Sequence, residues 1–244
     1  MEDKLNVKGL IFDFGGTLDT GGNHWGEVLW EVYRHFDVPV AKDAFRKAYI
    51  HGERTLAMHP LIQPHFHFAD VLCAKLRIQL GYLQEQGMLS ASFAPREELA
   101  EAMAAYADGC TREVLARSAR VLGRLRPKYS MVLVSNFYGN LHTVLQDAAL
   151  LPLFDCVIES AVVGVRKPNP AIFALGVCAC NLPVSETAVI GDSFDKDMKP
   201  ARALGCRTIW LKGSQWEEPR DADSNPVDVV VTELEEIERC LEFI

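Results

Sequence analysis

An aspartate, two glycines and a threonine close the first strongly apolar segment of the chain. The run Lys8–Phe12 leads directly to Asp13, Gly15, Gly16 and Thr17. A carboxylate at the end of a buried strand is exposed at the edge of a sheet, where it can bind a hard cation or attack phosphorus to form an aspartyl-phosphate. The glycines let a phosphate approach the backbone, and the threonine hydroxyl can hold the loop. A strand that ends in an Asp-Gly turn is common in α/β proteins, so this segment alone indicates no function.

Polar residues follow a second apolar run and also stand before a pair of prolines. Ser135 and Asn136 end the run SMVLVS, where a hydroxyl and backbone N–H groups could hold a phosphoryl oxygen or simply cap a helix. Lys167 precedes Pro168 and Pro170, which restrict the backbone and fix the lysine before a helix. A fixed ammonium group at that point could neutralise both a phosphoryl group and an attacking carboxylate.

Acidic residues crowd after a further apolar run. The segment TAVI is followed by Asp192, Asp195 and Asp197. Carboxylates packed at one strand end repel each other unless a cation lies among them, and Mg²⁺ needs only one or two protein carboxylates besides its waters and substrate. Asp195 has the simpler alternative of an acidic residue at a solvated helix N-terminus.

Alternating strands and helices must position these side chains. The expected strands are 8–12, 130–135, 156–160, 187–190, 207–211 and 227–231, and the expected helices among them are 141–149, 170–180, 197–204 and 233–243. This alternation predicts an α/β fold with a doubly wound, Rossmann-like parallel sheet covered by helices on both faces. Ligands of such sheets bind beyond the carboxyl ends of the strands, which is where Asp13, Ser135 and Asp192 stand.

A block of about one hundred residues interrupts the alternation after the first strand. It contains amphipathic stretches at 25–36, 42–52, 69–83 and 97–119, with a loop marked by Pro60 and Pro64. We expect residues 1–21 and 123–244 to form the Rossmann-like core. Residues 22–122 are expected to form an inserted, all-helical cap domain over the active site.

The four motifs, in this order and at expected strand ends, resemble those of the haloacid dehalogenase superfamily over essentially the whole chain. The resemblance implies that Asp13 is the nucleophile and that Lys167 neutralises charge during catalysis. It also implies that Ser135 and Asn136, with Gly16 in the first loop, bind the phosphoryl oxygens of the substrate.

The resemblance further implies a magnesium site. By comparison with the family, Asp192 coordinates Mg²⁺ together with Asp13 and the backbone carbonyl of Gly15. Thr17 is expected to hold the nucleophile's loop, and Asp197 to orient the metal or bridge to it through water. The expected function is a magnesium-dependent phosphatase that acts on a small phosphorylated metabolite through an aspartyl-phosphate.

The chain departs from the family pattern at one position. Phosphatases and phosphomutases of this family carry a second aspartate two residues after the nucleophile, where this chain has Gly15. That aspartate protonates the leaving oxygen and then activates the water, a contribution of about 10²–10⁴-fold. A cap residue or a bound water could take over this work. The cap candidates are His51, Glu53, His59, His65 and His67, of which His65 and His67 are also weak candidates for a metal site.

Other interpretations stay open. Phosphonate-cleaving relatives have a small residue at the Gly15 position and form a Schiff base with a cap lysine, but nothing marks Lys42 or Lys47 as buried, and Arg54 stands where such a lysine is expected. Dehalogenases also lack the second aspartate but need no metal, whereas the acidic residues near Asp192 favour one. A weakly active protein that only binds a phosphorylated ligand or partner is the third alternative.

Composition excludes several classes of function. The net charge of −8 argues against a general nucleic-acid-binding surface. No apolar run is long enough to span a membrane, and we expect no secretory leader. Seven scattered cysteines without a C-x-x-C pair favour reduced thiols in a cytoplasmic protein. A cap favours small substrates, and aromatic cap residues could line the pocket, namely Trp25, Tyr33, Phe66 and Phe68. The sequence carries no signal for an oligomeric state.

Overall fold

A six-stranded parallel sheet forms the centre of the molecule. The computed structural model describes residues 4–89, 93, 97–217 and 227–242. The strands are β1 (Gly9–Phe12), β2 (Ser130–Ser135), β3 (Cys156–Glu159), β4 (Thr187–Gly191), β5 (Arg207–Leu211) and β6 (Val229–Val231). Their order is β3-β2-β1-β4-β5-β6, with every neighbouring pair parallel. All six predicted strands are therefore present, and the doubly wound α/β fold is confirmed.

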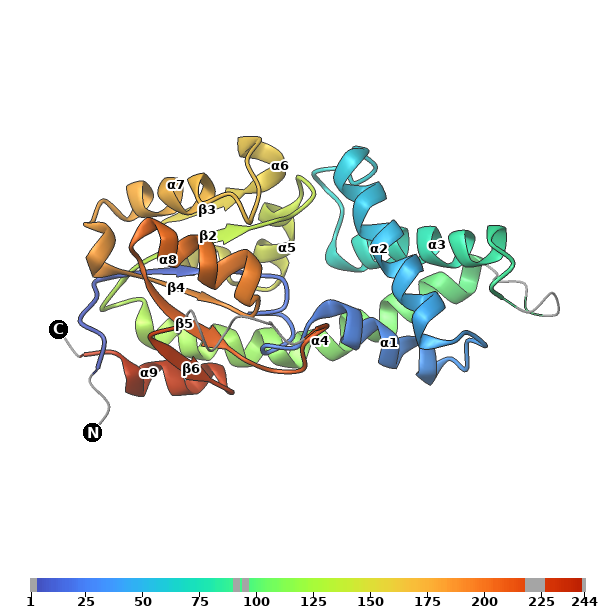
Figure 1. Ribbon diagram of the computed structural model, residues 1–244, viewed down its shortest axis with the longest axis horizontal. Helices are drawn as coiled ribbons and strands as arrows, with labels where there is room; N and C mark the ends of the chain where they lie inside the picture. Colours follow the sequence, from blue (N-terminus) through green and yellow to red (C-terminus); the bar gives the residue numbers. More distant parts are fainter. Residues whose placement is uncertain (1–3, 90–92, 94–96, 218–226, 243–244) are drawn as a thin grey trace.

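Helices cover both faces of the sheet, as the near-continuous apolar strands require. Successive β1 residues point to opposite faces, so Ile11 packs with helices α7 (Ala171–Cys180) and α8 (Lys199–Leu204), whereas Phe12 packs with the end of α4 (Glu97–Leu125). Figure 1 shows α7 and α8 on one side of the sheet and α4, with the short C-terminal helix α9 (Ile237–Cys240), on the other. Helix α5 (Leu141–Asp147) and the single turn α6 (Ser160–Val163) follow β2 and β3.

The remaining helices lie together beyond the carboxyl ends of the strands (Figure 1). They are α1 (Trp25–His35), α2 (Lys42–Met58) and α3 (Phe68–Glu85). The 29-residue helix α4 packs along α3 at its start and under the sheet at its end. The predicted boundary at residue 122 thus falls inside α4. The division into a core and a cap domain stays a prediction.

Several expected helices begin or end elsewhere. The helix expected at 233–243 is a 3₁₀ turn, Leu234–Glu236, followed by α9, which ends at Cys240, and α4 runs past residue 119 to Leu125. Helix α2 continues past Gly52 to Met58. Gly52 lies inside the helix because it faces the Gln79 side chain on α3, where an added Cβ would stand 3.2 Å from Gln79 Cγ, so the glycine allows the two helices to approach. The segment expected as one helix, 197–204, is a wide π-type turn (Phe194–Met198) followed by α8. None of the described helices is long and apolar enough to cross a membrane.

Candidate active site

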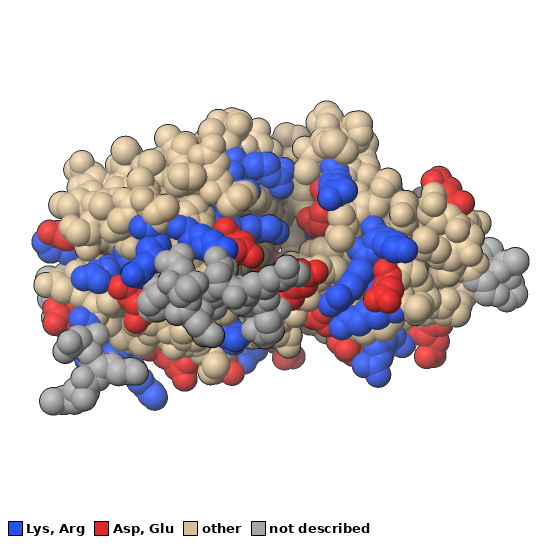
Figure 2. Space-filling model, viewed as in Figure 1, with Lys and Arg blue, Asp and Glu red and all other residues tan. Residues whose placement is uncertain are grey.

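The carboxyl ends of the central strands open into a cavity. Helices α1, α2 and α3, together called the helical block, cover it. Its lining from the sheet side includes Asp13, Gly15, Ser135, Asn136, Lys167, Asp192 and Asp197. Its lining from the helices includes Trp25, Tyr49, Glu53, Phe68, Leu72 and Lys75. Figure 2 shows the hollow between the sheet part and the helical part, with both basic and acidic side chains along its margin. The other two predicted site residues, Gly16 and Thr17, lie in the loop that follows Asp13.

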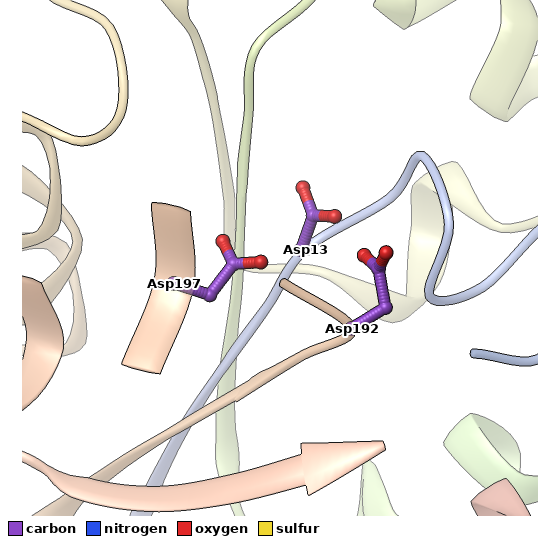
Figure 3. A group of neighbouring side chains, drawn as sticks. All are labelled: Asp13, Asp192 and Asp197. Atoms are coloured by element: carbon purple, nitrogen blue, oxygen red, sulfur yellow. The ribbon is translucent and has the colours of Figure 1, made fainter. Parts of the chain in front are cut away.

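Three buried aspartates face one another at the floor of the cavity. Asp13 follows β1, and Asp192 follows the neighbouring strand β4, so the parallel pairing of Phe12 with Ile190 brings the two side chains together. Asp197 comes from the π-type turn just after them. One carboxylate oxygen of each lies within 4.8 Å of the others, and Figure 3 shows all three pointing toward a common centre.

Crowding of buried carboxylates perturbs their ionisation. Burial, reinforced by the charge of Asp13, raises the pKa of Asp192 well above its usual range. Burial likewise raises the pKa of Asp197 to about 6, although Lys167 opposes the shift. When all three carboxylates are ionised, the single ammonium of Lys167 leaves two negative charges uncompensated. This donor set fits a hard divalent cation such as Mg²⁺, which binds carboxylate oxygens and supplies the missing charge.

Lys167 is the cation that the protein itself supplies. Its Nζ lies 2.6 Å from Asp13 Oδ1 and 2.6 Å from Asp197 Oδ1. Burial opposes the charged form, but the two carboxylates outweigh it and raise the pKa of Lys167. The side chain of Asn136 accepts a hydrogen bond from the Lys167 N–H at 2.9 Å and donates one to the Lys167 carbonyl at 3.1 Å. The Asn136 amide therefore positions Lys167, while Ser135 lines the cavity at the end of β2.

The loop after Asp13 is tied to the acidic cluster. Thr17 Oγ1 lies 3.2 Å from Asp13 Oδ2 and 3.1 Å from Asp192 Oδ1, and it accepts the Asp192 N–H at 3.0 Å. Its single hydroxyl proton is donated to one carboxylate at a time. Gly16 has φ +102°, and an added Cβ would collide with the Asp192 carboxylate. Only glycine allows this close approach of the loop to Asp192.

Gly15 is different, because the backbone does not require a glycine there. Its φ is not in the left-handed region, and an added Cβ would find no atom closer than Trp25 Cδ1 at 3.9 Å. The position expected for a second aspartate therefore has room for a Cβ atom. Residue 15 lacks a carboxyl group because it is a glycine, and not because neighbouring atoms would block a Cβ there.

Asp19 has a structural function that the sequence analysis did not assign. It is fully buried, and its carboxylate accepts hydrogen bonds from the Gly16 N–H at 2.7 Å and from Trp25 Nε1 at 2.8 Å. Burial raises the pKa of Asp19 to about 7. The carboxylate thus joins the glycine loop to the start of α1. In the sequence, Asp19 ends the same short motif as Asp13, and Trp25 follows closely. An acidic residue so placed is a signal for a carboxylate that supports the loop.

Charged residues of the helices reach the opposite side of the cavity. Lys75 Nζ on α3 lies 2.6 Å from Glu53 Oε1 on α2, and Tyr138 Oη from the sheet side donates to Glu53 Oε2 at 2.9 Å. Burial raises the pKa of Glu53, but Lys75 outweighs this effect and the net shift is downward. Burial opposes the charge of Lys75, yet Glu53 raises its pKa. Both groups are therefore ionised near neutral pH.

Sequence analysis named Glu53 among candidate proton carriers and missed Lys75. Leu72 and Leu76 are buried on the same face of α3 as Lys75. A lysine on the apolar face of an amphipathic helix is the signal that marks it. His24 was also missed. It begins α1, its Nδ1 accepts the Gly26 N–H at 3.0 Å, and burial lowers its pKa to about 4, so it lines the cavity as a neutral ring.

The structure places the four candidate cap histidines on the surface and outside the cavity lining, namely His51, His59, His65 and His67. The His51 ring stacks on Tyr82, and His67 Nδ1 lies 2.5 Å from the Asp147 carboxylate. Within the described ranges, the only group of three acidic, histidine or cysteine side chains close enough to share a metal is the aspartate cluster. The histidine-rich loop is thus no part of the candidate site.

The other cap candidates divide between the cavity and the rest of the fold. Lys42 forms a 2.6 Å ion pair with Glu27, and Lys47 is exposed on α2. Of the aromatic residues expected to line the pocket, Trp25 and Phe68 do so. Tyr33 is buried in the helical core, and Phe66 packs in a separate small cluster.

Comparison with known proteins agrees with this geometry. Residues 7–205 match the family described as haloacid dehalogenase-like hydrolase. A phosphoserine phosphatase of Thermus thermophilus is 34% identical over 38% of this chain and 36% of its own length. A glyceraldehyde 3-phosphate phosphatase of Methanocaldococcus jannaschii is 34% identical over 35% of this chain and 37% of its own length. The chain therefore aligns with little more than a third of either relative.

A solved structure resembles the whole fold. The putative HAD-hydrolase YfnB from Bacillus subtilis, bound to magnesium, superposes with a TM-score of 0.62 at 18% identity, over 98% of this chain and 100% of that one. At this identity the likeness concerns the fold alone. The match over residues 7–205, together with the sheet order and the aspartate cluster, shows that the chain belongs to the haloacid dehalogenase-like hydrolase family.

Proposed function

We propose that this protein is a magnesium-dependent phosphatase that hydrolyses a small phosphorylated metabolite through an aspartyl-phosphate on Asp13. The observation that carries the proposal is the environment of Asp13. Its carboxylate is buried at the end of β1, is held by Lys167 and Thr17, and lies beside Asp192 and Asp197. Two relatives that bear the name of phosphatases support the reaction class.

The metal would be held by the carboxylates of Asp13 and Asp192 and by the backbone carbonyl of Gly15, with Asp197 beside them. When bound, Mg²⁺ would neutralise negative charge on the phosphoryl group. In the first step a carboxylate oxygen of Asp13 forms a bond to phosphorus while the bond to the leaving oxygen breaks. Lys167, fixed by Asn136, would stabilise the charge on the phosphoryl oxygens, and Ser135 would orient them.

The leaving oxygen then needs a proton, and we propose that none of the titratable groups on the helical side of the cavity supplies it. Asp19, whose pKa is raised to about 7, is engaged by the Gly16 N–H and the Trp25 indole. Glu53 is ionised and Lys75 is held in its ion pair, while His24 is neutral with a pKa of about 4. We propose that water supplies this proton and later attacks phosphorus to release Asp13. Leaving groups that need no protonation should therefore react fastest.

The helical block would act as a lid. A cavity enclosed between the sheet and α1–α3 suits small substrates, and closure over it would exclude water except at the reacting centre. A cytoplasmic location is also part of the proposal. It is supported by the seven scattered cysteines of the sequence, which include no C-x-x-C pair.

Phosphonate cleavage is the second candidate, because a lysine from the helices does reach the cavity and position 15 is small. A Schiff base would have to form on Lys75. The ion pair with Glu53 keeps that amine protonated, and a protonated amine is not a nucleophile. Trapping of an imine by borohydride in the presence of a phosphonoaldehyde would favour this candidate over a phosphatase.

The test of the proposed function compares leaving groups. Release of phosphate is measured with Mg²⁺ for an aryl phosphate, which hardly needs protonation, and for alkyl phosphates, which do. Asp13→Asn serves as the blank. We expect metal-dependent turnover of the aryl ester and slower turnover of alkyl esters. A wild type that matches the blank on both kinds of ester would refute the proposal.

A further inference from the structure

The segment that follows β5 leaves the sheet and contacts the helical block. We call residues 212–217 the β5 arm, and Figure 1 shows it running from the sheet toward the start of α1. The ring centroid of Trp216 lies 4.9 Å from that of Tyr49 and 6.3 Å from that of Phe45, both on α2. It also lies 5.2 Å from the ring of His24, which caps α1. One side chain from the sheet part therefore packs against two helices of the block.

An arginine of α2 holds the same tryptophan by its backbone and by its ring. Arg46 Nη2 donates a hydrogen bond to the Trp216 carbonyl at 3.0 Å. The guanidinium carbon of Arg46 lies 4.8 Å from the centroid of the Trp216 ring, where the negative face of an indole attracts a cation. Glu27 on α1 lies 3.9 Å from the same Nη2. The guanidinium thus links the β5 arm to both helices.

The β5 arm also binds the connection through which the chain enters the helical block. The Gly213 N–H donates to the Gly22 carbonyl at 3.1 Å, and the Ser214 N–H donates to Asn23 Oδ1 at 2.9 Å. In return, the His24 N–H donates to the Ser214 carbonyl at 2.9 Å. An added Cβ would lie 2.9 Å from the Gly213 nitrogen if placed on Gly22, and 2.7 Å from the Gly22 carbonyl carbon if placed on Gly213. The two glycines therefore allow this close approach of the two backbones.

A third glycine makes room for the tryptophan ring. Gly26 is buried in the first turn of α1, where an added Cβ would lie 2.1 Å from Trp216 Cζ3. Its φ is not in the left-handed region, so the helix itself has no need of glycine there. Glycine weakens a helix relative to alanine. We infer that the contact with Trp216 is the reason for a glycine at this position.

Trp216 contacts the wall of the active-site cavity from outside it. His24 and Tyr49 line the cavity, whereas Trp216 is not among the lining residues. The tryptophan therefore affects a substrate only through the residues that it holds. Because the β5 arm continues from a strand of the sheet, its contacts fix the helical wall of the cavity relative to the aspartates.

We propose that Trp216 is a positioning residue that holds the helical block closed over the active site by anchoring the β5 arm between α1 and α2. The inference rests on the proposed phosphatase function, in which the block acts as a lid. A substrate that binds the closed form has an apparent affinity proportional to the closed fraction. Loss of the anchor should therefore raise KM, while kcat, measured when substrate fills and closes the site, should change little.

The kinetic test measures hydrolysis of an aryl phosphate with Mg²⁺ in the wild type, Trp216→Ala and Trp216→Phe. An aromatic pair, or a cation–π contact at a partly exposed site, changes an equilibrium by about 2- to 12-fold. We expect KM to rise about 10-fold or more in Trp216→Ala, because several such contacts are lost. Trp216→Phe keeps a ring and should recover most of the affinity. A merely structural role would lower the amount of active protein, so a fall in kcat with an unchanged KM would overturn the inference.

A second variant displaces the ring without removing it. Gly26→Ala should raise KM as Trp216→Ala does, because its Cβ collides with the indole. In the double variant the collision is absent, so KM should be no higher than in Trp216→Ala alone. Gly81→Ala, on α3 of the same block, is the matched control, since its added Cβ would have no atom within 4 Å. Increases in KM that multiply in the double variant, or an equal increase in Gly81→Ala, would overturn the inference.

Amide hydrogen exchange, followed by mass spectrometry in Mg²⁺, tests the anchor without reference to activity. The amides of Gly213, Ser214 and His24 join the β5 arm to the entering connection. They should exchange faster in Trp216→Ala and Gly26→Ala than in the wild type and Gly81→Ala. Unchanged exchange in folded Trp216→Ala would overturn the inference. If the wild type hydrolyses no ester, the proposed function fails, and exchange alone decides whether Trp216 anchors the block.

Discussion

Replacing Gly15 with aspartate should place a proton donor where related phosphatases are expected to carry one. The position can hold a Cβ atom, because it would lie 3.9 Å from Trp25 Cδ1 and 4.0 Å from Trp25 Nε1, which is ordinary contact distance. The backbone conformation needs no glycine. We therefore expect the Gly15→Asp variant to fold, with a change in the free energy of unfolding of no more than about 1–2 kcal/mol.

The expected gain follows from the chemistry of the leaving group. A positioned general acid contributes about 10²–10⁴-fold, or about 3–5 kcal/mol of activation free energy. The new carboxyl would lie near the buried Asp13 and Asp19, whose charges and burial should raise its pKa and keep part of it protonated near neutral pH. The gain should appear only for alkyl phosphates.

The assay is the ratio of kcat/KM for an alkyl phosphate to that for an aryl phosphate, measured in the wild type, Gly15→Asp and Gly15→Asn. The asparagine variant has nearly the same shape and cannot transfer the proton. We expect the ratio to rise about 10²–10⁴-fold in Gly15→Asp and to stay near the wild-type value in Gly15→Asn. An equal rise in both variants, or no rise in a folded Gly15→Asp protein that still cleaves the aryl ester, would refute the reasoning.

Further predictions concern the residues around the cavity. Asp13→Asn should abolish turnover of every phosphate ester, measured as phosphate release. In the absence of Mg²⁺ its unfolding temperature should rise, because one buried negative charge is removed. Lys167→Met should lower kcat by about 10²-fold or more. It should also enlarge the increase in unfolding temperature that Mg²⁺ produces, because in the described part of the chain Lys167 is the only side-chain cation paired with Asp13 and Asp197. Burial raises the pKa of Asp197 to about 6, so the folded state favours its protonated form. The metal-free protein should therefore lose stability as pH rises from about 4 to about 6. Unfolding temperatures measured against pH should show this fall in EDTA and a different dependence on pH in Mg²⁺. Trp25→Phe removes the indole donor to Asp19 and should cost about 1–3 kcal/mol in urea unfolding, with an unchanged midpoint counting against the assigned role of that hydrogen bond.

The sequence alone determined the sheet and the side of it that carries chemistry. Apolar runs such as Ser130–Ser135 form strands that are buried on both faces. The helices between these runs allow neighbouring strands to pair in parallel. Parallel strands end at one edge, so residues that follow strand ends, such as Asp13, Ser135 and Asp192, must meet there. The local pattern of residues and the order of elements along the chain are enough to place these side chains at one edge.

Contacts between helices, and between helices and the sheet, were decided by the tertiary structure. Glu53 and Lys75 lie on different helices and meet only because α2 packs along α3, with Gly52 permitting the close approach. Asn136 is predicted to hold phosphoryl oxygens, and its side chain also binds the backbone of Lys167, 31 residues away in the chain, a contact that the sequence did not indicate. Such pairs depend on the rotation and spacing of whole elements, which residue periodicity along a single element does not encode.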